Sequence, residues 1–485
     1  MPINAVGIIG MGEMGRLYAD WISKRTEHQQ QQDDEEITVH CCDVPERYDE
    51  LCAAYADSPR VRVHRDGFAV VRQCGLVMYS VETANMDRVV GLYGPATRVG
   101  AIVAGQTSVK APEIAAFERH LPSDAHIVTC HSLHGPRVSP RGQTMVVIRH
   151  RCDKDDVFRD ALAVFRRLES NMVEMSAETH DRITANTQVI SHLGFQAMGT
   201  AWRSVGVYPW EQQRYLGGID NVKILMCLRI FAAKPHIYSG LAMQNPQARY
   251  HVEQYVRSVS ELFRLMIQER QQEFTARIYA ARAAVFGRVL NESDAGTPSR
   301  SANVEACTTE QTPASSNPPA VASSSTSTRA LLLPDAILAE YGLGRIPASE
   351  RTPNSHLSLL AMVDAWYAMK VNPYDDLVCQ TPVFRLRLGI AEYLFCDKEL
   401  LDESIAAALF NKSIRGDDME FFAAVREWAT IILNGDLRGY EDHFLRVRQF
   451  FESRLQDGFK ASCVLIDRLA STSATPNLQS GHKQS

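Results

Sequence analysis

The sequence GIIGMGEMG, from Gly7 to Gly15, decides the fold of the first part of the chain. It follows a short β-type run, opens a helical pattern and has the spacing GxGxxG. In such a turn the first glycine permits a tight bend, the second lets backbone approach a pyrophosphate, and the third lets helix pack close to strand. The free N–H groups of the helix N-terminus favour a bound anion. We therefore predict a dinucleotide site that includes the turn residues Gly10, Met11, Gly12, Glu13, Met14 and Gly15.

Short β-type runs recur through the first 151 residues and alternate with helical stretches. The runs are Ala5–Gly10, Ile37–Cys42, Leu76–Ser80, Ala101–Ala104, His126–Cys130 and Met145–Arg149. Strands that alternate with helices are typical of a parallel, doubly wound sheet. We predict an α/β Rossmann domain with a mostly parallel sheet over residues 1–152.

The rest of the chain has long amphipathic patterns and contains an internal repeat. Residues 191–209 read SHLGFQAMGTAWRSVGVYP and residues 355–373 read SHLSLLAMVDAWYAMKVNP, with nine of 19 positions identical at an offset of 164. A chance likeness of two amphipathic helices is the alternative to a duplication. We predict an all-α region with an internal duplication: a helical domain at 153–290, a disordered Ser/Pro-rich linker at 291–330, a second helical unit at 331–470 and a disordered tail at 471–485.

Composition excludes several classes of protein. The 485 residues carry a net charge of −6 without a basic stripe, so we expect no nucleic-acid partner. No apolar run of about 18 residues exists, so we expect no membrane span, and the N-terminus does not resemble a signal peptide. The 11 cysteines form no CxxC pair. We therefore expect buried, reduced thiols in a cytoplasmic protein and no metal site.

Two residues at the end of the second predicted strand give conflicting signals about the cofactor. Asp43 could bind the adenosine ribose hydroxyls, which favours NAD. Arg47 could neutralise a 2′-phosphate, which favours NADP. The polar run before Asp43 lengthens the path between the glycine turn and this acid, so spacing alone leaves the choice open.

Polar side chains follow three later strands, where ligands of a doubly wound sheet bind. Ser80 and Val81 follow the first of these strands, Ser108 and Lys110 the second, and His131 the third. Histidine is a natural general base because its pKa lies near neutrality. Taken singly, Ser108 could be a helix N-cap, Lys110 a surface cation and His131 a structural residue. Together they favour a catalytic crevice.

Six motifs give the sequence a more specific likeness: GIIGMGEMG, GQTSVKAPEIAAFE, VTCHSLHGP, HDRITANTQ, NVKILMCLRIFA and NSHLSLLAMVDAW. With these the chain resembles the prephenate dehydrogenase family of tyrosine biosynthesis, most closely its fungal members, over about residues 6–288 and 331–455. The resemblance implies a Rossmann domain, a helical domain that normally dimerises, and an oxidoreductase that converts prephenate to 4-hydroxyphenylpyruvate with loss of CO₂. The fungal branch implies NADP, with NAD still possible.

The resemblance also implies roles for individual residues. His131 is similar to the catalytic histidine that hydrogen-bonds the substrate hydroxyl, and Ser108 and Lys110 to residues that position the substrate and this histidine. Arg229 is similar to the arginine that grips a substrate carboxylate. Some relatives carry a further histidine that this chain lacks, and His192 is the nearest substitute, although a buried helix–helix histidine is an equal alternative.

In the second copy Tyr393 stands at the position that matches Arg229, so we expect a scaffold without the substrate arginine. We expect this copy to cover the surface where another subunit would dock, which makes the chain a monomer with an internal pseudo-dimer. An ordinary homodimer is the alternative.

Other functions remain open on sequence grounds. Arogenate differs from prephenate only by an amine for the keto group. A β-hydroxyacid or 6-phosphogluconate-type dehydrogenase shares the GxGxMG turn, but the helical lysine–asparagine pair of such enzymes is missing before Arg229. A nucleotide-sensing regulator is the remote alternative.

Overall fold

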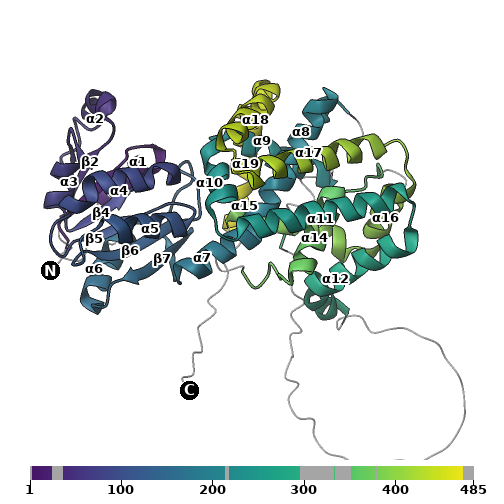
Figure 1. Cartoon of the computed structure of the whole chain (residues 1–485), viewed down its shortest axis with the longest axis horizontal. Coiled ribbons are helices and arrows are strands. Elements are labelled where there is room, and N and C mark those ends of the chain that lie inside the picture. The colour runs from purple at the N-terminus through teal and green to yellow at the C-terminus, as the bar shows by residue number, and fades with distance from the viewer. Residues whose placement is uncertain are drawn as a thin grey trace, which may run out of the picture.

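The computed structural model describes residues 3–24, 36–212, 218–294, 332–333, 351–376 and 381–472. A sheet domain and a helical region lie side by side (Figure 1). The predicted α/β domain followed by a helical region is confirmed. The expected linker and tail fall mostly outside the described residues, but the flanking helices run on to Asp294 and Thr472, further than we predicted.

One sheet of eight strands forms the first domain, in the order β3-β2-β1-β4-β5-β6-β7-β8. The strands are β1 (Ala5–Ile9), β2 (Thr38–Cys42), β3 (Val61–Val63), β4 (Leu76–Tyr79), β5 (Ile102–Gly105), β6 (His126–Ser132), β7 (Thr144–Arg151) and β8 (Asn171–Glu174). The first six are parallel in the order 3-2-1-4-5-6 of dinucleotide-binding domains. β7 runs antiparallel to β6, and β8 is parallel to β7.

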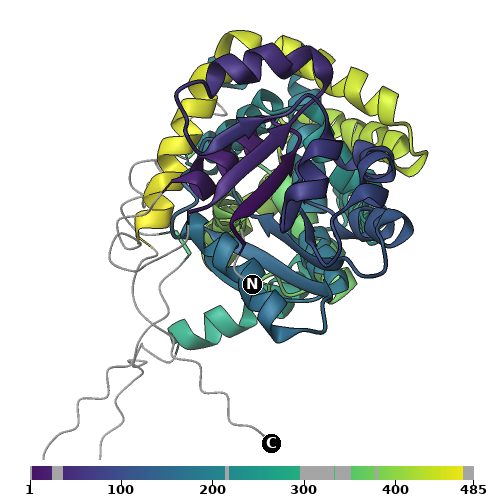
Figure 2. The ribbon, with the colours of Figure 1, turned by 90° about the vertical axis from the view of Figure 1, so that its left-hand side faces the viewer.

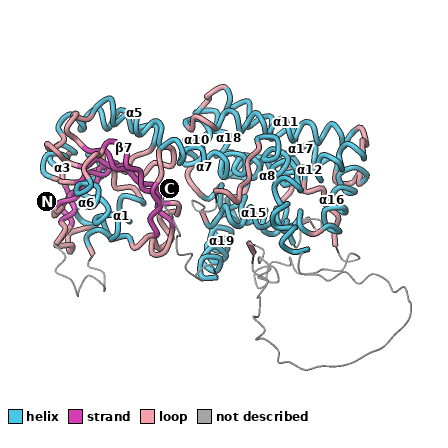
Figure 3. The backbone as a smooth tube through the Cα atoms, turned by 90° about the horizontal axis from the view of Figure 1, so that it is seen from below, coloured by secondary structure: helices cyan, strands magenta, loops and turns pink. Residues whose placement is uncertain are grey.

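Helices cover both faces of the sheet (Figures 2 and 3). They are α1 (Glu13–Ser23), α2 (Tyr48–Ala54), α3 (Gly67–Gln73), α4 (Met86–Tyr93), α5 (Lys110–His120) and α6 (Asp155–Phe165). Tyr18 of α1 and Phe165 of α6 are buried in the core of one face. Val70 of α3, Val90 of α4 and Phe117 of α5 are buried in the core of the other. Burial on both faces explains why the strands read as continuous apolar runs.

The predicted domain boundary at residue 152 is wrong. α6 packs in the core of the sheet domain, and β8 pairs with β7, so this domain continues to Glu174. β8 and the three-residue β3 lie at the two sheet edges and were not predicted. Both are too short and too little buried to show the apolar pattern by which the central strands were found.

The helical region begins with α7 and contains both copies of the repeat. The first copy has α7 (Ala177–Thr184), α8 (Ile190–Val205), α9 (Gly218–Ala232), α10 (Pro235–Gln244), α11 (Ala248–Ile267) and α12 (Gln271–Asp294). The second has α14 (Leu357–Met369), α15 (Pro382–Cys396), α16 (Lys398–Phe410), α17 (Arg415–Leu433), α18 (Leu437–Phe450) and α19 (Glu452–Thr472). Among the described residues, none of these helices has the length and hydropathy to cross a bilayer.

The two copies are intertwined around one apolar core. At the 164-residue offset, α8 to α11 correspond to α14 to α17. α8 packs mainly on α17 of the other copy, and its counterpart α14 packs mainly on α11. The indole of Trp428 donates to Thr200 (2.9 Å), and that of Trp366 donates to the carbonyl of Asn186 (3.0 Å). Each copy therefore buries its apolar faces against the other.

Candidate active site

The glycine turn between β1 and α1 has the geometry of a phosphate site. Gly10 has φ +97°, and a side chain there would collide with the carbonyl of Ser80 and with Val81. A side chain at Gly15 would collide with the Gly10 carbonyl, whereas nothing lies within 4 Å of a Cβ placed on Gly12. Gly12 is also the N-cap of α1 and supplies no side-chain cap. The helix N-terminus is therefore uncapped beside open space, where a pyrophosphate fits.

Loops from β2 and β4 border this turn. The Met11 N–H donates to Asp43 Oδ2 (2.7 Å), and Arg47 Nη1 donates to the same oxygen (2.7 Å) and to the Met11 carbonyl (3.1 Å). Asp43 is thus neutralised by the neighbouring guanidinium. An acid in this state repels a 2′-phosphate less than a free carboxylate does. The opposing signals of Asp43 and Arg47 come from one ion pair, and the donor set fits a nicotinamide dinucleotide.

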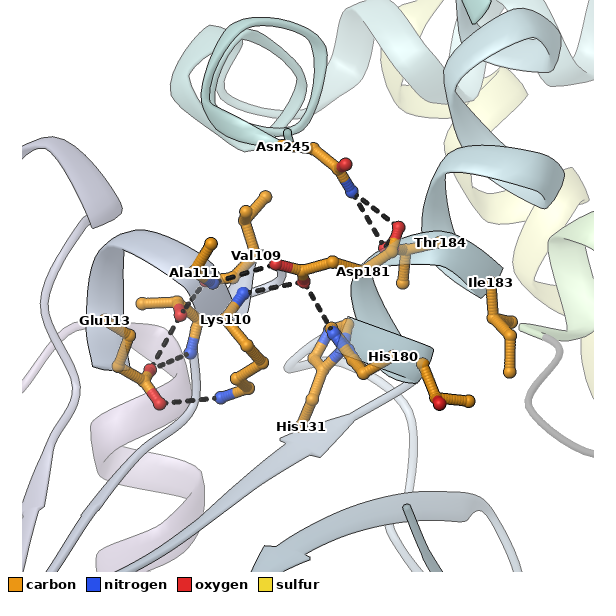
Figure 4. Close-up of polar contacts among 12 residues, drawn as sticks. Val109, Lys110, Ala111, Glu113, His131, His180, Asp181, Ile183, Thr184 and Asn245 are labelled. Carbon is orange, nitrogen blue, oxygen red and sulfur yellow. Dashed lines mark hydrogen bonds and ion pairs between the residues drawn. The ribbon is translucent and has the colours of Figure 1, made fainter. Parts of the chain in front are cut away.

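His131 lies on β6 and is joined to a second histidine and an aspartate on α7. His131 Nδ1 is 2.8 Å from His180 Nε2, and His180 Nδ1 is 2.9 Å from Asp181 Oδ1. All three side chains are buried. Asp181 also accepts the N–H groups of Lys110 and Ala111, each at 2.8 Å, at the start of α5 (Figure 4).

These contacts determine which nitrogen of His131 is basic. Both oxygens of Asp181 already accept backbone N–H groups, so Asp181 acts as an ionised acceptor. His180 Nδ1 must then carry a proton and donate to Asp181, which leaves His180 Nε2 as an acceptor. His131 Nδ1 therefore donates to His180, and His131 Nε2 keeps its lone pair. We call His131, His180 and Asp181 the relay.

Burial keeps the relay imidazoles neutral. Burial, then the neighbouring His180 and Lys110, hold the pKa of His131 well below its usual value. Burial likewise lowers the pKa of His180, although Asp181 opposes this shift. Both rings are consequently neutral at physiological pH, the state in which His131 can accept a proton.

The structure contradicts the prediction that Lys110 contacts the substrate. Its side chain is 0% exposed, and Nζ binds Glu113 Oε1 (2.9 Å) and the Cys130 carbonyl (2.6 Å). The ammonium therefore stays inside the domain, and only the backbone N–H supports the relay. Ser108 precedes the N-cap Val109 of α5, does not cap this helix and is partly exposed at the loop after β5.

Arg229 lies on α9 at the side of the helical region that faces the sheet domain. It binds Ser462 Oγ (3.1 Å) and Cys463 Sγ (3.4 Å) of α19, and its guanidinium lies 5.1 Å from the centre of the Phe459 ring. The guanidinium of Arg137, six residues after His131, lies 5.1 Å from the same ring. Arg229 is therefore close to the loop that leaves the relay strand.

His192 lies on α8 and is enclosed by helices. Its ring centre is 4.8 Å from that of Tyr238 on α10, and its Nδ1 has no hydrogen-bond partner among the described residues. Burial lowers its pKa well below the usual value.

The sequence did not single out His180 or Asp181. Both lie in the motif HDRITANTQ, but their connection with His131 depends on α7 packing beside β6. An adjacent histidine and aspartate in a family motif was the available signal. The described residues contain no cluster of His, Cys, Asp and Glu that could hold a metal ion.

Comparisons with known proteins agree with this architecture. Residues 189–298 and 311–471 match a family model described as a 6-phosphogluconate dehydrogenase C-terminal domain. The chain is 40% identical over 464 residues to a probable prephenate dehydrogenase (NADP(+)) of Schizosaccharomyces pombe, covering 96% of this chain and 97% of that one. It is 40% identical over 461 residues to prephenate dehydrogenase (NADP(+)) of Saccharomyces cerevisiae, covering 94% and 91%.

A solved structure of prephenate dehydrogenase from A. aeolicus matches with a TM-score of 0.43 and 15% identity, covering 57% of this chain and 95% of that one. The family model and the two fungal relatives each extend over more than half of the chain. The chain therefore belongs to the prephenate dehydrogenase family, together with these fungal NADP(+)-linked relatives.

Proposed function

We propose that this chain oxidises prephenate to 4-hydroxyphenylpyruvate and CO₂ with NADP as the oxidant. The observation that carries the proposal is the relay, which presents the unprotonated Nε2 of a neutral, buried His131 at the end of β6. This end of the sheet is where a doubly wound domain holds the reactive part of its ligands. The names of the two fungal relatives support the substrate and the cofactor.

The first role of the chain is to remove the hydroxyl proton. His131 Nε2 accepts it as the ring alcohol becomes a ketone, and Asp181 stabilises the resulting imidazolium through His180. NADP, when bound, accepts the hydride from the same carbon. General-base help of this kind is worth roughly 10²–10⁴-fold in rate. Loss of CO₂ then produces an aromatic ring, so the protein need not provide a separate acid for that step.

The second role is to orient the substrate. Arg229 would hold a carboxylate, because a guanidinium binds a carboxylate through two parallel hydrogen bonds. Its present partners, a hydroxyl and a thiol, are neutral. Ser108 would lie beside the substrate at the loop after β5. His192 would line the same side of the site from α8.

The cofactor would lie along the glycine turn. Gly12, with the uncapped N-terminus of α1, would hold the pyrophosphate, and Ser80 and Val81 would border the nicotinamide. Arg47 would face the 2′-phosphate, with Asp43 neutralised beside it.

Absorbance of the reduced cofactor tests the function. We expect rapid reduction with prephenate and NADP, and a lower kcat/KM when arogenate or NAD replaces either partner. Absence of reduction with prephenate would contradict the proposal. Faster reduction with arogenate would assign the chain to the arogenate branch.

A further inference from the structure

The second copy places a buried arginine against the first copy without a counter-charge. Arg387 on α15 is 2% exposed. Its Nη1 donates to Ser191 Oγ (3.0 Å), its guanidinium lies 5.1 Å from the centre of the Phe195 ring, and its Nε has no partner. No carboxylate pairs with it among the residues that the structure describes. Burial and the nearby Arg229 lower its pKa to about 10.

A buried charge without a partner destabilises a fold, so its presence calls for an explanation. The surroundings of Arg387 provide one. His192, whose Nδ1 is also unpartnered, and Tyr238 lie close enough for Arg387 to shift their pKa values. Arg229 completes the group, and its polar contacts are a hydroxyl and a thiol. We call Arg229, Arg387, His192 and Tyr238 the arginine cluster; it has two cations and no acid.

Helix α10 connects the arginine cluster with the candidate active site. It carries Tyr238, and its His236 pairs with Glu82 in the loop after β4 (3.3 Å). Just beyond the other end of α10, Asn245 donates to the backbone carbonyl of Asp181 in the relay (2.8 Å). The helix therefore runs between the loop after β4 and the relay, and it holds Tyr238 beside the crevice (Figure 1).

Prephenate carries two carboxylates, and the arginine cluster offers two guanidinium groups. Two unpaired cations in a desolvated site attract a dianion strongly, because each opposite charge stabilises the other more in a low dielectric than in water. A single arginine would leave the second carboxylate desolvated without compensation.

We propose that Arg387 binds one substrate carboxylate while Arg229 binds the other. This inference rests on the proposed function and adds to it: the second copy of the repeat supplies a substrate ligand to the site of the first. The second copy is then part of the active site as well as a packing scaffold.

Steady-state kinetics of Arg387→Met test this role. We expect the KM for prephenate to rise at least about 30-fold, since truncating one partner of a buried charge pair is strongly unfavourable. The dissociation constant for NADP should stay within about twofold of the wild-type value. The Tm of the ligand-free variant should rise, because an uncompensated buried charge is removed. A merely structural arginine would instead give a lower Tm and an unchanged KM.

Matched variants keep the test decisive. Arg385→Met, two residues along the same helix, should retain the wild-type KM. If Arg387→Met fails to fold, the polar and uncharged Arg387→Gln replaces it, with the same expected rise in KM. A wild-type KM in the folded variant overturns the inference, while reduction of NADP by the wild-type enzyme tests the proposed function separately.

The product identifies the carboxylate that Arg387 holds, because 4-hydroxyphenylpyruvate keeps only one of the two. Weaker product inhibition in Arg387→Met, together with the raised KM, assigns Arg387 to the retained carboxylate. Unchanged product inhibition with the raised KM assigns it to the carboxylate lost as CO₂. Both outcomes support the inference.

Discussion

The two copies of the helical repeat place a cation beside a histidine in the same way but balance its charge differently. In one, Arg387 lies near His192 and has no acid. In the other, Lys223, the counterpart of Arg387 at the 164-residue offset, binds His356 Nδ1 (2.7 Å) and also Asp220 (3.0 Å). Phe384 stands where Asp220 would be expected in the first arrangement. A cation with its own counter-ion needs no ligand, whereas one without can receive the substrate's.

The space beside each histidine supports the same contrast. His356 borders a cavity of about 60 Å³ lined by Trp202, Phe421 and Asp418, among others. Sites for small molecules usually measure about 300–1,000 Å³. Three acids besides Asp220 line this cavity, namely Asp417, Asp418 and Glu420. A small, acidic cavity is unsuited to a dianion, so we expect one active site in each chain.

The largest expected effect concerns the relay, which faces only one of the two arrangements. His131→Asn removes the basic Nε2 and should lower kcat roughly 10²–10⁴-fold with little change in NADP affinity. Asp181→Asn should lower kcat as well, because an amide N–H donated to His180 would reverse both tautomers and place a proton on His131 Nε2. Near-normal turnover in His131→Asn would remove the imidazole from the mechanism.

The histidine itself was predictable from the sequence, but its setting was not. The glycine turn and the strand order around it place His131 at a ligand-binding edge by topology alone. Lys110 was misjudged because Glu113, three residues later on α5, pairs with it inside the domain. Arg387 was missed because its role depends on α15 packing against α8 of the other copy, and a local pattern does not report such a contact.

A smaller effect separates the matched positions Arg229 and Tyr393. Arg229→Ala should raise the KM for prephenate about 30-fold or more, since a carboxylate loses its partner. Tyr393→Ala, at the same place in the other copy, should leave the KM within about twofold of the wild-type value. Equal changes in both variants would mean that the two copies take part equally, which contradicts the comparison.

A stability effect concerns the acids beside His356. Burial raises the pKa of Asp418 to about 7 from its ordinary value of 3.8. The folded state therefore holds this proton more tightly than the unfolded chain, and the stability that Asp418 contributes below about pH 4 is lost as the pH rises to about 7. Asp418→Asn should stabilise the protein above pH 7, by the order of 1–3 kcal/mol.

Denaturant unfolding at pH 5 and pH 8 measures this effect. The gain from Asp418→Asn should be larger at pH 8 than at pH 5. Asn can still accept the hydrogen bond that Ser355 Oγ now donates to Asp418 Oδ1 (2.6 Å), so this contact provides no separate pH dependence. An equal gain at both pH values would show that Asp418 ionises as it does in the unfolded chain.

The smallest expected effect is an unchanged mass on dilution. Because the copies bury their apolar faces against each other, we infer that the chain is a monomer with an internal pseudo-dimer. Light scattering should give the monomer mass across at least about a hundredfold range of concentration. A stable dimer mass would show that another surface joins two chains.

Binding stoichiometry tests the central claim most directly. Titration of prephenate into the enzyme loaded with NADPH, which cannot be reduced further, counts substrate sites by calorimetry without turnover. The asymmetry between Arg387 and the neutralised Lys223 predicts one prephenate for each chain, with that binding weakened in Arg387→Met. Two equivalent sites in each chain, or one site unaffected by Arg387→Met, would contradict the account.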